Sequence, residues 1–144
     1  MRVGNFAAFE KQVIADLYDP DVAYLTRWKL ITTPWFAVYL HKIHLNDGDR
    51  DLHDHPWPFA GVVLRGGYIE ERGNGTVITR RAGSFGVLRL GDIHSVRELL
   101  RQPTWTLIAR GKDQDTWGFQ TPDGWVEWRE YVDQKRSEAA SSDK

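Results

Sequence analysis

Two histidines that are separated by a single residue form the most informative feature of the sequence. His53 and His55 flank Asp54 in the stretch Leu-His-Asp-His-Pro-Trp. Alternate residues of an extended strand point to the same face, so both imidazoles would aim at one point. A third histidine, His94, follows a Gly-Asp turn that would lead into another strand. Three neutral imidazoles on one divalent ion leave coordination positions open, which is typical of a reactive metal site.

The residues around this pair resemble the first motif of the cupin superfamily. That motif runs from a glycine through His-x-His and three or four further residues to a glutamate, and it closes on a glycine. Gly48 stands before the pair, and the stretch Val-Leu-Arg-Gly at 63–66 resembles the closing segment. Ala60 stands where most metal cupins have the glutamate ligand. The resemblance therefore implies a three-histidine site, similar to that of the thiol dioxygenase branch of the superfamily.

A later stretch resembles the second cupin motif, in which a histidine ligand follows a Pro-x-Gly turn. Gly83, Gly91 and His94 stand at the glycine and histidine positions of that motif. Arg89 replaces the proline, and Glu98 replaces an asparagine. Together with the stretch Leu-Arg-Gly-Gly-Tyr, the pattern is similar to uncharacterised small cupins of bacteria and their phages.

The resemblance spans roughly residues 34–110 and implies an all-β fold, the double-stranded β-helix or jelly-roll barrel of cupins. The chain's own patterning agrees, because short apolar segments alternate with Gly- and Asn-rich turns. We therefore expect a barrel over about residues 26–131. The expected strands are 26–33, 35–45, 60–71, 76–81, 84–88, 94–100, 104–110, 117–120 and 126–131.

The two ends of the chain have different patterns. Apolar residues from Phe6 to Leu17 recur at three- and four-residue spacing, which predicts an N-terminal amphipathic helix over about 5–18. The polar and small residues at 136–144 predict a flexible tail. The remainder, 1–135, is expected to be a single cupin domain.

Composition narrows the class of protein. The chain has 144 residues, no cysteine and a formal net charge of -1. The missing cysteines exclude disulfides and zinc-thiolate sites, and the charge argues against nucleic acid as a partner. The sequence has no signal-peptide pattern and no apolar run long enough for a membrane span. We expect a soluble cytoplasmic protein and, from the surplus of apolar surface at both ends of the chain, a homodimer.

The metal ligands have two interpretations. His53, His55 and His94 either bind the ion, which we favour because three buried imidazoles without partners would cost free energy, or remain in a barrel that has lost its metal. Glu98 lies four residues after His94 and therefore shares its strand parity, so it is a possible additional ligand. We favour a surface position for Glu98, paired with Arg97 or Arg101, because strand parity slips at bulges.

The neighbouring residues have supporting roles in these interpretations. Asp51 and Asp54 would either orient an imidazole or stabilise a turn. Arg89 is the favoured arginine for gripping an anionic group of the substrate, ahead of Arg65, Arg80 and Arg110. His41 and His44 are three residues apart and point to opposite faces of a strand, so they are assigned to packing or to the surface. The candidate pocket residues are Trp57, Phe59, Tyr68, Trp105 and Trp117, although aromatic residues on sheets are more often simple core.

These features predict a metal-dependent enzyme of dioxygenase type that acts on a small molecule. Fe(II) held by three neutral histidines keeps its full charge and has open positions for an anionic substrate and dioxygen. Zinc, nickel or manganese would direct the same site to other reactions. Two alternatives stay open. One is a sugar-type isomerase or epimerase with His55, Asp54 and Tyr68 as acid–base groups, and the other is a ligand-binding cupin without turnover.

Overall fold

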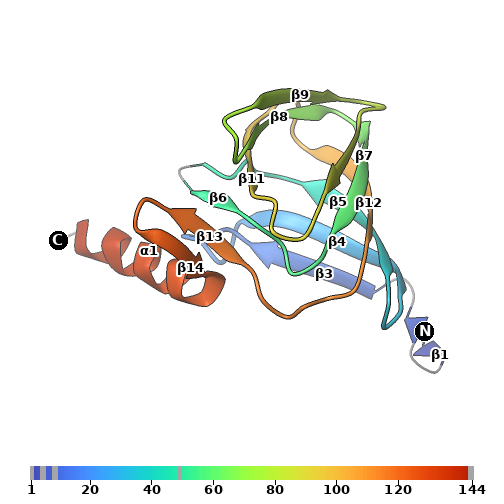
Figure 1. Ribbon diagram of the computed structural model, residues 1–144, viewed down its shortest axis with the longest axis horizontal. Coiled ribbons are helices and arrows are strands. Elements are labelled where there is room, and N and C mark those ends of the chain that lie inside the picture. Colours follow the sequence, from blue (N-terminus) through green and yellow to red (C-terminus); the bar gives the residue numbers. More distant parts are fainter. Residues whose placement is uncertain (1, 4–5, 8–9, 49, 143–144) are drawn as a thin grey trace.

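The computed structural model describes residues 2–3, 6–7, 10–48 and 50–142. Within these ranges the chain forms short antiparallel strands and one C-terminal helix (Figure 1). The strands are β1 Arg2–Val3, β2 Phe6–Ala7, β3 Glu10–Ala15, β4 Ala23–Thr32, β5 Ala37–Ile43, β6 Leu52–His53, β7 Phe59–Arg65, β8 Gly67–Arg72, β9 Val77–Arg81, β10 Phe85–Leu88, β11 His94–Leu99, β12 Thr104–Arg110, β13 Gly118–Thr121 and β14 Gly124–Glu127; the helix is α1 Trp128–Ser142.

The strands form two antiparallel sheets, as expected for a jelly-roll barrel. The larger sheet has the order β1-β2-β4-β5-β12-β7-β10, and β3 pairs with β4 along the same edge as β2. The smaller sheet has the order β14-β13-β6-β11-β8-β9. Figure 1 shows β8 and β9 at one end of the molecule and β13, β14 and α1 at another. β6 and β11, which carry histidines, are therefore central strands of the smaller sheet.

Alternation along β5 and β12 defines the inner face of the larger sheet. Ala37, Tyr39 and His41 are buried on β5, and every second residue of β12 is buried from Thr104 to Arg110. Because side chains of a strand alternate between faces, these residues all point to the interior. Ala37 and Tyr39 form the core with Ile108 of β12.

The single strand predicted at 60–71 is two strands that belong to different sheets. β7 ends at Arg65, and β8 begins at Gly67. Gly66 and Gly67 have φ values of +87° and +151°, a region that residues with a Cβ rarely adopt. A Cβ on Gly67 would also lie 2.3 Å from the carbonyl oxygen of Arg80. This glycine pair therefore lets the chain cross from the larger sheet to the smaller one.

The predicted N-terminal helix is wrong. Residues 6–7 and 10–15 are strands, and β3 pairs with β4 over its whole length. Pairing with β3 satisfies the backbone groups along one edge of the ten-residue β4, which a helix could not do. The apolar residues divide between two faces, since Val13 is 55% exposed whereas the next residue of the strand, Ile14, is half-buried. Residues 5, 8 and 9 of the predicted helix lie outside the described residues.

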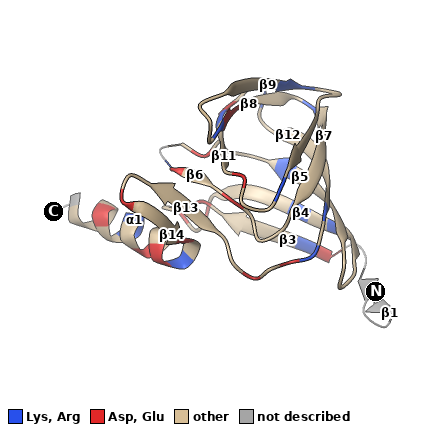
Figure 2. Cartoon of the chain, viewed as in Figure 1, with Lys and Arg blue, Asp and Glu red and all other residues tan. Residues whose placement is uncertain are grey.

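The C-terminal segment also differs from the prediction. The strand predicted at 126–131 ends at Glu127, and α1 continues to Ser142, so the predicted flexible tail is helical over 136–142. Good helix formers fill the segment, and charges of both signs are spread along it (Figure 2). Tyr131, which is 1% exposed, stacks on Phe119 of β13 with ring centroids 3.8 Å apart. This contact attaches the start of the helix to the smaller sheet. Among the residues described, no helix is both long and apolar enough to cross a bilayer.

Candidate metal centre and cavity

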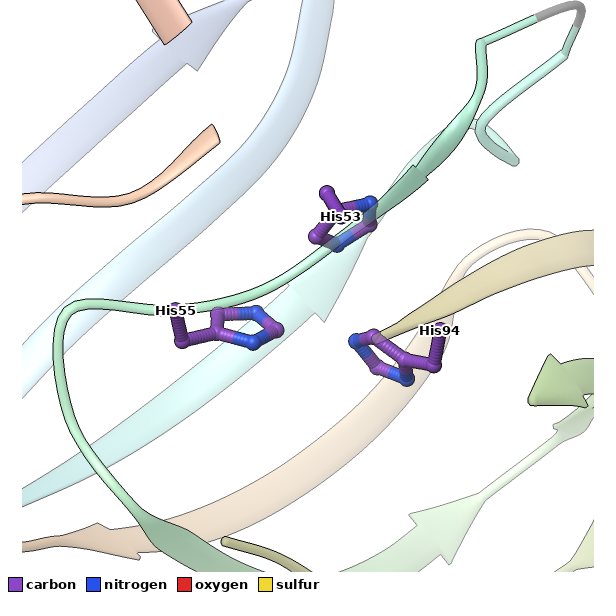
Figure 3. Close-up of side chains that lie close together, drawn as sticks. All are labelled: His53, His55 and His94. Carbon is purple, nitrogen blue, oxygen red and sulfur yellow. The ribbon is translucent and has the colours of Figure 1, made fainter. Parts of the chain in front are cut away.

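Three histidines from β6, from the segment that follows it and from β11 meet inside the barrel (Figure 3). His53 ends β6, His55 follows it two residues later, and His94 begins β11. His53 is directly opposite His94 in the register of these strands. The pairing of β6 with β11 therefore brings together residues that are about forty positions apart in sequence, as the two motifs predict.

The distances suit a shared ion. The ring centroids are 5.1 Å apart for His53 and His55, 4.9 Å for His53 and His94, and 5.0 Å for His55 and His94. One ring nitrogen from each residue can be chosen so that all three lie within 4.8 Å of one another. Figure 3 shows the three rings directed toward a common point. Neither Glu98 nor any other carboxylate of the described residues joins this group.

Two of the histidines are held in the neutral form that a metal requires. Burial lowers the pKa of His53 to about 4, although the charge of Asp47 acts in the opposite direction. Burial also lowers the pKa of His55 well below its ordinary value. Lone pairs on these rings are therefore available at neutral pH. Within the described residues, the Nδ1 atoms of His53 and His55 are buried without a hydrogen-bond partner, a cost that coordination to an ion can offset.

Glu70 is a functional candidate that the sequence interpretation missed. It lies on β8, is 1% exposed, and accepts a hydrogen bond of 2.9 Å from Nδ1 of His94. An ionised carboxylate can only accept, so the proton of His94 is on Nδ1 and its Nε2 is left for a ligand. A carboxylate behind a histidine is a common partner of metal-binding imidazoles. The donor set therefore fits a divalent ion.

Two arginines keep Glu70 ionised. Arg80 donates from Nε to Oε2 at 2.9 Å, and Arg72 Nε forms an ion pair with Oε1 at 2.8 Å, with an N–H direction that does not meet hydrogen-bond geometry. Burial alone would raise the pKa of Glu70, but the hydrogen bonds with His94 and Arg80 outweigh it and lower that pKa to about 2. Glu70 thus remains a charged acceptor for His94 throughout the physiological pH range.

Phe59, and not Ala60, occupies the position of the missing carboxylate ligand. Ala60 pairs with Val87 and Ala109, which are both exposed, so it lies on the outer face of β7. The ring of Phe59 lies edge-on to His55, with centroids 4.8 Å apart, and 6.2 Å from the ring of His94. The motif allows three or four residues before its glutamate, and the structure corresponds to three. An apolar ring thus closes one side of the three-histidine group.

Glu98 does not reach the site. The pairing of β11 with β8 has a register shift between Val96 and Glu98, and Glu98 is exposed beyond it. The bulge reverses the parity that would have turned the side chain inward. The possible ligand is therefore a surface carboxylate, the alternative favoured from sequence.

Asp51 and Asp54 have structural roles in place of the proposed contacts with imidazoles. Asp51 accepts a hydrogen bond from the hydroxyl of Tyr131. Asp54 accepts from the backbone N–H of Gly118 at 2.7 Å and from Nε1 of Trp125 at 3.2 Å. These contacts attach the histidine segment to α1 and to the β13–β14 hairpin.

Asp47 helps to hold the segment before His53 in place. It lies in a turn, and the sequence around it did not indicate this role. It is 2% exposed and accepts hydrogen bonds from the hydroxyl of Tyr24 and from the backbone N–H of Val96. Burial would raise the pKa of Asp47, but the nearby His53 and these hydrogen bonds lower it overall. The contact with β11 helps to hold the chain before His53 against the strand that carries His94.

The histidines line a cavity of about 610 Å³, large enough for a small molecule. Of the predicted pocket residues, Trp57, Phe59, Tyr68 and Trp117 line it. Trp105 does not, because it points to the other face of β12 and stacks on Trp28, with centroids 5.6 Å apart.

The arginine predicted to grip the substrate lies elsewhere. Arg89 is exposed, outside the cavity, in a turn that Asp92 closes by accepting from its backbone N–H. Arg65 is exposed as well. Arg27 and Arg80 line the cavity instead, together with His41, one of the two histidines assigned to packing or surface.

Comparisons with known proteins identify the fold. No family profile and no curated protein matches the sequence. Among solved structures, a cupin-2 domain protein from Rhodospirillum rubrum is 12% identical with a TM-score of 0.61, over 86% of this chain and 81% of its own. An RmlC-like cupin from Shewanella frigidimarina is 12% identical with a TM-score of 0.51, over 64% of this chain and 79% of its own. The Fe(II) form of HppE is 16% identical with a TM-score of 0.56, over 71% of this chain and 56% of its own.

At these identities the likeness shows the fold alone. The chain has the cupin fold, and the prediction from the two histidine motifs is confirmed.

Proposed function

We propose that this protein is a metal-dependent cupin enzyme of oxygenase type, with Fe(II) held by His53, His55 and His94. The single observation that carries the proposal is the three-histidine group with Glu70 behind His94. Similarity of fold to the Fe(II) form of HppE is consistent with iron. When bound, the ion supplies a Lewis acid and open coordination positions for a substrate and dioxygen.

The residues of the chain prepare the site for this role. Neutral His53 and His55 add no charge, so an ion would keep its full positive charge and favour an anionic substrate. Glu70 fixes the orientation and tautomer of His94. Phe59 excludes a carboxylate ligand and water from one side of the group. The cavity, lined by Trp57 and Trp117, leaves room for the substrate beside the histidines.

The isomerase alternative has less support. It requires a carboxylate that orients His55, but Asp54 is bound to Gly118 and Trp125.

A homodimer remains part of the proposal, supported by the exposed apolar side chains of Leu64, Phe85 and Val87 on the outer face of β7 and β10.

Metal analysis tests the function. The protein is purified without metal, loaded anaerobically with iron(II), zinc, nickel or manganese, and desalted. Wild type should retain about one ion per chain, and the three single His→Ala variants should lose it. His44→Ala is the matched control, because His44 is bonded to Thr26 and is not part of the group. Retention of none of the four metals by wild type would contradict the proposal.

A second measurement separates an oxygenase from a closed structural site. Nitric oxide added to the Fe(II) protein probes open coordination positions and gives an EPR signal if one is free. Iron that is bound but silent toward nitric oxide would refute the oxygenase type while leaving the metal assignment intact.

A further inference from the structure

Two arginines flank a pair of aromatic rings, Tyr39 in the core and Trp57 in the wall of the cavity. The guanidinium carbon of Arg27 lies 4.7 Å from the ring centroid of Tyr39 and 5.7 Å from that of Trp57. The guanidinium carbon of Arg110 lies 5.5 Å and 4.8 Å from the same two centroids. Arg27 comes from β4 and Arg110 from the end of β12, so two central strands of the larger sheet place two positive charges side by side.

Neither charge is balanced by a carboxylate. Among the described residues, Arg27 and Arg110 form no ion pair, whereas the cavity-lining Arg50 and Arg80 pair with Asp16 and Glu70. Arg110 is 8% exposed and donates to the hydroxyl of Tyr39 and to the carbonyl of Gly111. These neutral acceptors leave its charge in place.

Arg27 has spare hydrogen-bond donors. Its Nε donates to Nε2 of His41 at 3.0 Å, and within the part of the chain that the structure describes its two terminal NH₂ groups donate no hydrogen bond. Burial and the charge of Arg27 lower the pKa of His41 to about 3, so this partner is neutral and acceptor-only at Nε2. Burial and Arg110 also lower the pKa of Arg27 itself. The guanidinium thus faces the cavity with free donors and an uncompensated charge.

Without a bound anion, this arrangement of charges is unfavourable in free energy. A partly buried charge with no counter-ion costs free energy, and a forked guanidinium matches the paired oxygens of a carboxylate or phosphate. Arg27 also shares the cavity with the metal-ligand candidates, and Trp57, which contacts it, is only two residues from His55. An anion held by Arg27 would therefore be tethered beside the three histidines.

We propose that Arg27, backed by Arg110, is the anchor for a carboxylate or phosphate group of the substrate. The anion site does not depend on the metal, and the inference rests on the proposed function only where it places the rest of the substrate beside the three histidines. It assigns to Arg27 the role that the sequence interpretation gave to Arg89. The substrate class is then a small anion with an apolar part that fits against Trp57.

Binding of simple anions tests the anchor without knowledge of the substrate. Inorganic phosphate, acetate, benzoate and neutral benzamide are titrated by calorimetry into metal-free protein at constant ionic strength. At least one anion should bind wild type, and its affinity should fall by about tenfold or more in Arg27→Gln. Arg89→Gln is the matched control, since Arg89 is exposed and outside the cavity, and it should bind as wild type does.

Three outcomes would overturn the proposal. The first is that none of the three anions has a higher affinity for wild type than for Arg27→Gln, or that none of them binds wild type at all. The second is an equal loss in Arg89→Gln. The third concerns wild type alone, so that it holds even if the variant fails to fold: acetate, benzoate and phosphate all binding no tighter than benzamide. Metal retention by Arg27→Gln is measured in parallel and should equal that of wild type. Loss of the metal assignment and loss of the anion site are thus seen separately.

Discussion

Glu70 accepts a hydrogen bond from Nδ1 of His94 across the pairing of β8 with β11, at 2.9 Å. The carboxylate is ionised because it also binds Arg80 and Arg72. A chain of charged and neutral groups thus leads from two arginines on the smaller sheet to the imidazole that faces the cavity. No carboxylate of the described residues joins the group of three histidines, and Glu70 contacts one of them, His94, at the ring nitrogen Nδ1.

Replacing Glu70 tests that relationship. Glu70→Gln should weaken metal affinity by about 10- to 100-fold, because the amide can no longer fix the tautomer of His94 as an ionised acceptor does. Dissociation constants are measured by competition with a chelator. Glu71→Gln is the matched control, since Glu71 is the next residue of β8 and also pairs with an arginine, Arg97, but does not line the cavity.

Glu98→Gln separates the two carboxylate assignments. Because Glu98 is exposed beyond the β11 bulge, this variant should bind metal as tightly as wild type. A large loss of affinity in Glu98→Gln, with little change in Glu70→Gln, would mean that the site has three histidines and one glutamate as direct ligands.

A carboxylate can be restored to the site at one of two neighbouring positions. Phe59→Glu should tighten metal binding by roughly tenfold and weaken binding of anions, because the added charge lies beside His55 and His94. Ala60→Glu is the control on the outer face of β7 and should change neither property. The same chelator competition, repeated with phosphate titrations, gives both affinities. If Ala60→Glu is the variant that tightens metal binding, the motif should be aligned with four intervening residues and the register of β7 is wrong.

The helix α1 makes a prediction about stability. Tyr131 is 1% exposed and stacks on Phe119, so Tyr131→Ala should lower the free energy of unfolding by about 3 kcal/mol through loss of buried contacts. Urea unfolding followed by tryptophan fluorescence measures this loss. Tyr18→Ala, a change at a tyrosine that is 47% exposed, provides the comparison and should cost much less. Equal losses in the two variants would show that α1 contributes little to the folded domain.

The parts of the structure that were predictable are those with a local signal. The spacing of His53 and His55 alone predicts that their side chains point to the same face, and the turn before His94 predicts the start of its strand. The strands of the barrel are bounded by glycine and asparagine turns, so their existence could be predicted even where Gly66 hides a change of sheet. Local sequence was therefore sufficient for the fold class and for the candidate ligands.

The remaining features depend on contacts between distant strands. Glu70 reaches His94 only because of the register of β8 against β11, and Glu98 misses the site only because of a bulge in that register. Arg27 and Arg110 are far apart in sequence and meet on the rings of Tyr39 and Trp57. The spacing of apolar residues near the N-terminus fits a helix, but the segment forms a strand because it pairs with the edge of β4. None of these pairings has a signature in a single sequence.

His41 makes a prediction about the dependence of stability on pH. Its pKa is lowered from 6.5 to about 3 in the folded protein, first by burial and then by Arg27. The unfolded chain therefore binds a proton below pH 6.5 that the folded protein does not, and stability is lost as pH falls from that value toward 3. The neutral variant His41→Gln lacks this proton but can still accept from Arg27.

Urea unfolding of the metal-free protein at two pH values measures the effect. Between about pH 7.5 and about pH 5.5, wild type should lose about 1.4 kcal/mol more stability than His41→Gln, which is the linkage of one proton over this range. His53 and His55 also resist protonation, but they are present in both proteins and cancel in the comparison. An equal loss in the two proteins would mean that His41 takes up a proton in the folded state, and that the neutral acceptor beside Arg27 does not exist at acidic pH.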